Sequence, residues 1–225
     1  MSITEVDREF ARSRSRVYDL LSRVFDGDVD ALSEAIETGA FVDLAAMLPA
    51  EFDTDALSRD DLDVEALSIG YDNLFDVPGP YYVPPFASAH VDDPSESFES
   101  DSKYHDVGSA GELLGDPAES IAELYEQTGF KPQRGDGIPD HVAAEFEFMA
   151  VLSARESRLD AAPDRSIDDD LLDVQAQVVD HLEWVDAFAD TVVDRDSAEG
   201  VYAAVCSFAS AFVAWDQLQL TTPTV

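Results

Sequence analysis

The stretch that decides the fold is Pro139-Asp140-His141-Val142-Ala143-Ala144-Glu145-Phe146-Glu147-Phe148-Met149-Ala150-Val151-Leu152. Proline and aspartate are common at helix starts, and the apolar residues Val142, Phe146 and Met149 follow at the spacing of one helical stripe. The stretch therefore predicts a buried helix. His141 and Glu145 lie four residues apart, so a carboxylate is expected one turn from an imidazole in the first turn.

The rest of the chain shows the same helical periodicity. Apolar spacing and helix-end residues predict further helices over residues 3–25, 28–38, 41–48, 61–75, 116–128, from the break at 160–170 to about 194, and 197–220. The last of these is expected at the centre of a bundle. No strand pattern interrupts the series. We therefore predict an all-α, single-domain helical bundle over residues 1–225 with long acidic loops.

A proline-rich loop separates the fourth predicted helix from the fifth. Residues 77–86 read Val-Pro-Gly-Pro-Tyr-Tyr-Val-Pro-Pro-Phe, which is incompatible with a helix and predicts a stiff, extended segment. Its aromatic residues Tyr81, Tyr82 and Phe86 either seal the core or form a rim for a partner. The acidic Ser- and Gly-rich residues that follow extend the expected mobile loop to about residue 115.

The composition limits the possible partners. The chain has 225 residues and a formal net charge of −36, with 45% hydrophobic and 10% aromatic residues. Such a chain folds despite its charge, because disordered acidic proteins lack these apolar residues. The excess of acid predicts a protein adapted to molar salt, where self-repulsion is screened. It disfavours nucleic acid as a partner and favours a basic peptide.

The single cysteine and the termini predict a soluble cytoplasmic protein. Cys206 lies in an apolar run without charge, which excludes a disulfide framework and predicts a buried core residue. That run is too short to span a membrane, and the N-terminus has no secretory apolar core. Arg8, Arg12 and Arg16 form a row along the first predicted helix, which indicates a solvated or salt-bridging face.

Catalytic patterns are weak. None of the four histidines follows an acidic residue at the spacing of a di-iron site, and the chain has no phosphate-binding loop or nucleophile elbow, so neither a metal nor a cofactor is expected. Asp140, His141 and Glu145 could still move a proton, and a hydrolytic or metal-dependent enzyme using them remains an alternative. In a structural role, Asp140 would cap its helix and His141 would bridge to a loop. We favour binding over catalysis.

Two of these stretches resemble signatures of the TorD/DmsD/NarJ family of cytoplasmic chaperones that assist maturation of molybdenum-containing oxidoreductases in anaerobic respiration. One is Tyr71-Asp72-Asn73-Leu74-Phe75 with Pro78-Gly79-Pro80 and Pro84-Pro85-Phe86-Ala87-Ser88, similar to Y-x-x-L-F-x-x-P and a later Pro-aromatic-x-Ser. The other runs from Pro139 to Met149 and is similar to P-D-H-x-x-x-E-L-x-F-M. His181-Leu182-x-Trp184 also resembles the C-terminal half of the family.

The resemblance implies an all-helical chaperone rather than an enzyme, acting as a monomer or a domain-swapped dimer. Its client would be the apo form, or the twin-arginine leader, of a dimethyl sulfoxide, trimethylamine N-oxide or nitrate reductase. The expected peptide-binding residues are Asp140, His141, Glu145, Tyr71, Pro85, Phe86, Ser88 and Phe148. In this view, Asp140 and Glu145 supply acid for the guanidinium groups, and the aromatic residues supply apolar surface.

Overall fold

The computed structural model describes residues 5–50, 53–59, 61–91, 115–159, 165–196 and 200–221. Within these ranges the regular structure is helical and contains no strand, which confirms the all-α prediction. The acidic segment 92–114, which the sequence predicts to be mobile, lies outside the described residues.

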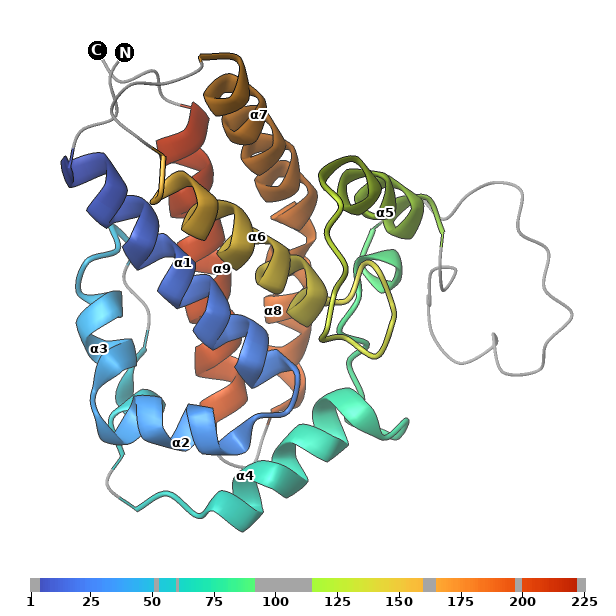
Figure 1. The fold of residues 1–225 in the computed structure, drawn as a ribbon. Coiled ribbons are helices and arrows are strands. Elements are labelled where there is room, and N and C mark those ends of the chain that lie inside the picture. Colours follow the sequence, from blue (N-terminus) through green and yellow to red (C-terminus); the bar gives the residue numbers. More distant parts are fainter. Residues whose placement is uncertain are drawn as a thin grey trace, which may run out of the picture.

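The centre of the bundle is built from long helices. α1 (Glu5–Phe25) packs along α6 (Val142–Glu156), and α8 (Val185–Arg195) packs along α9 (Val201–Thr221), while α7 (Arg165–His181) contacts both α6 and α9 (Figure 1). The decisive stretch therefore forms the buried helix that its spacing predicts.

The helix predicted from the break at 160–170 to about residue 194 is divided in two. A 3₁₀ turn, Leu182–Trp184, separates α7 from α8. Leu182, Trp184 and Val185 are all buried, and residues with this spacing do not share one stripe of a regular α-helix. The tighter turn changes the direction of the side chains and so allows all three to point into the bundle.

Shorter helices cover the ends of the bundle. α2 (Val29–Glu37), α3 (Ala40–Ala45) and α4 (Val64–Tyr71) lie at one end, and α5 (Asp116–Thr128) lies beside α7 (Figure 1). α3 ends three residues earlier than predicted, and α4 begins three residues later. The later start of α4 has a clear cause, because the Asp63 carboxylate accepts hydrogen bonds from the next free N–H groups and so caps the helix at that point.

An aromatic cluster forms the middle of the core. The ring of Phe25 on α1 lies 5.8 to 6.0 Å from the rings of Phe75, Phe146 and Phe188. Phe75 belongs to the π-helical turn Asp72–Asp76, which continues α4. Burial of each such side chain contributes about 1.5–3 kcal/mol, so this cluster holds α1, α6, α8 and the π-turn together.

A buried ion pair joins the first and last helices. Arg14 is 2% exposed, and its guanidinium donates to both carboxylate oxygens of Asp216, at 2.5 and 2.8 Å, and to Glu156 at 2.9 Å. Burial alone would lower the pKa of Arg14, but the neighbouring carboxylate of Asp216 outweighs it and raises that pKa. The predicted exposed row places Arg12 and Arg16 correctly, but it does not reveal the buried Arg14 between them.

α9 is longer than the charge-free run that is predicted from the sequence to be too short to span a membrane. By length and composition, its segment 201–220 could cross a membrane. However, more than half of this segment is buried inside the bundle, and it carries Asp216, whose carboxylate pairs with Arg14. Cys206 is also fully buried, and burial raises the pKa of its thiol. α9 is therefore a core helix in this structure.

Candidate peptide-binding site

At the start of α6, Asp140 and His141 exchange the structural roles considered from the sequence, in which Asp140 caps the helix and His141 bridges to a loop. His141, rather than Asp140, is the N-cap: its Nδ1 accepts a hydrogen bond from the Ala143 N–H at 3.1 Å. An imidazole that accepts at Nδ1 is favoured in its neutral form, and burial lowers the pKa of His141 to about 4. The bridge to a neighbouring loop comes from Asp140.

Asp140 binds residues 84–91, a segment that we name the strap. The Asp140 side chain is 0% exposed, and its Oδ2 accepts hydrogen bonds from the Ser88 N–H, at 2.8 Å, and from the Ser88 hydroxyl. On the main chain, the Ala87 N–H donates to the Asp140 carbonyl and the Val142 N–H donates to the Pro85 carbonyl, each at 2.9 Å. The strap is therefore held across the beginning of α6.

Glu145 is paired with His181 at the end of α7. Its side chain is 0% exposed, and its Oε2 lies 3.0 Å from Nδ1 of His181, whose Nε2 donates to the Pro117 carbonyl at 2.9 Å. Burial raises the pKa of Glu145. Burial by itself would lower the pKa of His181, but the Glu145 carboxylate outweighs it and raises that pKa to about 9. The pair is therefore an ion pair that ties α6 to α7 and to the start of α5.

The enclosure of these carboxylates corrects one expectation. Asp140 and Glu145 do not face an open cleft, because the strap covers one and His181 covers the other. Oδ1 of Asp140 nevertheless has no hydrogen-bond partner among the described residues, whereas the Glu145 carboxylate has the indole N–H of Trp184 as a neighbouring donor. Buried acceptors are rarely left this way, so Oδ1 of Asp140 marks a place where a donor is missing.

His90 corrects a second expectation. The sequence places it in the mobile acidic region together with His105, which lies outside the described residues. In the structure the His90 ring stacks on Trp184 at 5.6 Å and meets Phe188 edge-on at 5.4 Å. Its Nε2 donates to the Pro84 carbonyl at 2.7 Å, and burial lowers the pKa of His90. His90 therefore attaches the end of the strap to the 3₁₀ turn Leu182–Trp184 and to α8.

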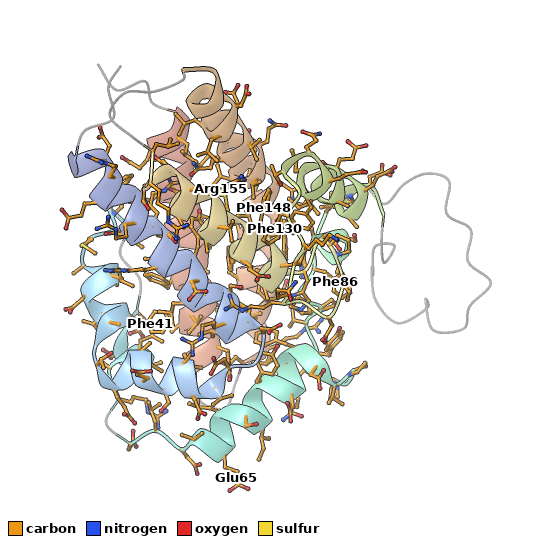
Figure 2. The ribbon with its side chains drawn as sticks, viewed as in Figure 1. Phe41, Glu65, Phe86, Phe130, Phe148 and Arg155 are labelled. Carbon is orange, nitrogen blue, oxygen red and sulfur yellow. The ribbon has the colours of Figure 1, made fainter. Side chains whose placement is uncertain are left out.

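The remaining predicted site residues fall into two groups. Pro85 and Phe86 lie in the strap beside the start of α6, with Pro85 buried and Phe86 partly exposed. Tyr71 and Phe148 are used elsewhere: the Tyr71 hydroxyl donates to the Phe25 carbonyl at 2.9 Å, and the fully buried Phe148 packs 4.7 Å from the ring of Phe130 (Figure 2). The structure therefore brings together Asp140, His141, Glu145, Pro85, Phe86 and Ser88.

Spacing along the chain does not reveal His181 as the partner of Glu145, because the two residues are 36 positions apart. The available signal is the resemblance of His181-Leu182-x-Trp184 to the family pattern. An acid/base enzyme at this junction would need access for a substrate, which the strap and His181 obstruct. Among the described residues, no group of three or more His, Cys, Asp or Glu side chains is arranged to hold a metal ion.

A separate cavity of about 590 Å³ lies between α5, α6 and α7. Its lining mixes apolar and polar side chains, including Leu152, Arg155, Asp173 and Gln177. Figure 2 labels Arg155 near the end of α6. No site residue predicted from the sequence contributes to this lining.

The protein is therefore an all-α bundle in which the strap is held across the beginning of α6, where buried polar side chains gather. A family model described as nitrate reductase delta subunit matches residues 30–190, and the chain belongs to this family. Its members are chaperones for the maturation of molybdenum enzymes, which confirms the family-level resemblance. Searches of curated proteins and of solved structures found no significant match.

Proposed function

We propose that the protein is a client-specific cytoplasmic chaperone that binds the twin-arginine leader, the apo form, or both, of a molybdenum-containing reductase of the dimethyl sulfoxide, trimethylamine N-oxide or nitrate reductase type. Binding would keep the client from export until its cofactor is inserted. The proposal rests on family membership together with the chemistry of the junction between the strap and α6.

The observation that carries the proposal is the unpaired oxygen of Asp140 beside a second buried carboxylate. Oδ1 of Asp140 is a buried acceptor that finds no donor in the described part of the chain, and the carboxylate of Glu145 lies close enough to interact with it electrostatically. Guanidinium groups present several N–H donors in a planar fork that matches carboxylates. A segment with two adjacent arginines therefore supplies the donors that this junction lacks.

Apolar surface lies on the loop that leads to the junction. Val77 is 53% exposed and Tyr81 is 51% exposed, and both precede the strap. Arg195 at the end of α8 donates to the Tyr82 carbonyl, which fixes this loop on the bundle. A leader has an apolar segment after its arginines, so an apolar rim beside buried carboxylates suits both of its parts. The net charge of −36 favours a basic ligand over an acidic one.

Fluorescence anisotropy in molar KCl tests the proposal. The probe is a labelled leader peptide, compared with a version in which the two arginines are replaced by lysines. Lysine has the charge but not the planar fork, so the arginine peptide should bind about tenfold more tightly or better. Equal affinity for the two peptides would contradict the proposal.

A matched pair of variants locates the site. Glu145→Gln removes a buried carboxylate and should weaken binding of the arginine peptide by about tenfold or more. Glu123→Gln changes an exposed carboxylate on α5 and should leave binding unchanged. A similar effect of the two substitutions would indicate general charge attraction rather than a site at this junction.

A further inference from the structure

The strap has few attachments to the bundle. Within the described ranges, two main-chain hydrogen bonds, given above, flank the bridge between Phe86 and His141. The short 3₁₀ turn Ala87–Ala89 follows, and the His90 ring ends the segment against Trp184 and Phe188. A segment with so few hydrogen bonds can leave its place without unfolding a helix.

The strap donates hydrogen bonds to only one of the two carboxylate oxygens of Asp140. Both hydrogen bonds from Ser88 go to the same oxygen, Oδ2 of Asp140. Oδ1 of Asp140 stays without a donor among the residues described here. The side chains of Asp140 and Glu145 lie close enough to interact electrostatically, and the strap covers Asp140 without satisfying both of its oxygens.

We propose that the strap is an autoinhibitory segment: it occupies the client site in the free protein and is displaced when a basic client segment binds. This inference rests on the proposed function and adds how the same site is regulated. The guanidinium groups of the client take over from the Ser88 donors and also reach the free Oδ1 of Asp140. The client thus satisfies more acceptors than the strap does, and this difference drives the exchange.

The main chain of the strap defines how the client would lie. When the strap leaves, the Val142 N–H and the Asp140 carbonyl lose their partners in Pro85 and Ala87. An extended client segment can restore both hydrogen bonds by pairing in the same manner, as in other cases where a peptide takes the place of a strand. Pro84 and Pro85 restrict the backbone at the beginning of the strap, so this part of it moves as one piece.

Substitution of Ser88 distinguishes this role from direct contact with the client. Ser88→Ala removes one of the two donors that hold the strap closed, so the arginine leader peptide should bind about tenfold more tightly. Ser120→Ala, at an exposed position on α5, should leave the affinity unchanged. If Ser88 contacts the client instead, Ser88→Ala weakens binding, and either this result or an unchanged affinity would overturn the proposal.

A reversible crosslink tests the movement itself. Phe86 and His141 face each other as a non-hydrogen-bonded antiparallel pair, whose Cα atoms are typically about 4.5 Å apart and suit a disulfide. The Phe86→Cys/His141→Cys protein, with Cys206→Ala to remove the native thiol, should bind the arginine peptide at least about 100-fold less tightly when oxidised than when reduced.

The outcomes separate the two proposals. Equal binding by the oxidised and reduced forms would show that the strap need not move. If the reduced form binds too weakly to measure, the affinity of Ser88→Ala decides the question. Failure of the unsubstituted protein to prefer the arginine peptide would instead contradict the proposed function.

Discussion

Gly135 lies directly against His141, the residue that caps α6. A Cβ atom at position 135 would lie 2.8 Å from Cβ of His141 and 3.0 Å from its Cγ. Gly135 also has a φ of +81°, and its N–H donates to Asp26 on the loop after α1 at 2.9 Å. The turn that precedes α6 therefore fixes the cap, and with it the junction that carries the proposed function.

Gly135→Ala should destabilise the protein more than Gly137→Ala. Both glycines have positive φ values, +81° and +79°, so both substitutions carry similar backbone strain, roughly 1–2 kcal/mol. Only Gly135 adds a clash with His141, because a Cβ at 137 meets nothing within 4 Å. The further cost should be about 1–3 kcal/mol, measured by urea unfolding. Equal destabilisation would show that the contact is easily relieved.

The histidines predict a maximum of stability near pH 6.5. The pKa of His181 rises to about 9 in the folded state, so its contribution is complete below pH 6.5 and is lost as the pH rises through about 9. The pKa of His141 falls to about 4, so stability decreases as the pH falls from 6.5 through that value. Glu145, whose pKa is also raised, acts in the same direction as His181.

Two substitutions separate the loss of stability above pH 6.5 (the alkaline limb) from the loss below it (the acid limb), when the free energy of unfolding is measured across pH. His181→Gln should remove the alkaline limb, worth at most roughly 3 kcal/mol. His141→Asn keeps a good helix cap and should remove the acid limb instead. Each variant is the control for the other. A difference between wild type and His181→Gln that stays constant from pH 6.5 to 9 would contradict the ion pair with Glu145.

Asp216→Asn should cost about 3–5 kcal/mol of unfolding free energy, because it leaves the buried Arg14 guanidinium without its main counter-charge. Asp190 on α8 is exposed, so Asp190→Asn should change the stability by less than about 0.5 kcal/mol. Chemical denaturation of the two variants under the same salt makes the comparison. Similar small effects would show that Arg14 is solvated in solution.

Added salt should stabilise the fold. Above a salt concentration of about 1 M, further salt should have little effect on the affinity for the leader. Raising KCl from 0.1 to 1 M shortens the screening length from about 10 to 3 Å, which reduces repulsion among the surface carboxylates, so the melting temperature should increase. Between 1 and 4 M the apolar contacts should preserve most of the leader affinity. A steep loss of affinity over that range would show that charge dominates recognition.

Local patterns in the sequence predict most of the fold. The stripe Val142, Phe146 and Met149 predicts α6 correctly, and all three side chains are fully buried. The break at Leu182–Trp184 and the buried Arg14 are not predictable in the same way. Both depend on packing against other helices, and helical periodicity within one segment carries no information about those contacts.

For the candidate site, the sequence predicts which residues come together but not what each of them does. The motifs indicate Asp140, His141, Glu145 and Ser88, and the structure brings them to one junction. Their individual roles depend on long-range contacts: Ser88 is 52 residues from Asp140, and His181 is 36 residues from Glu145. Sequence spacing also gives no warning that the carboxylates are enclosed, since enclosure comes from the strap and from α7.

Photo-crosslinking of a leader peptide to the unmodified protein is the most direct test of the proposed site. A photoreactive residue placed next to the two arginines should attach to residues 81–91 and to the start of α6, as located by mass spectrometry. The peptide with two lysines should give much weaker crosslinking at the same positions. Crosslinks concentrated at the cavity between α5, α6 and α7, or equal yields for the two peptides, would contradict a client site at the strap and α6.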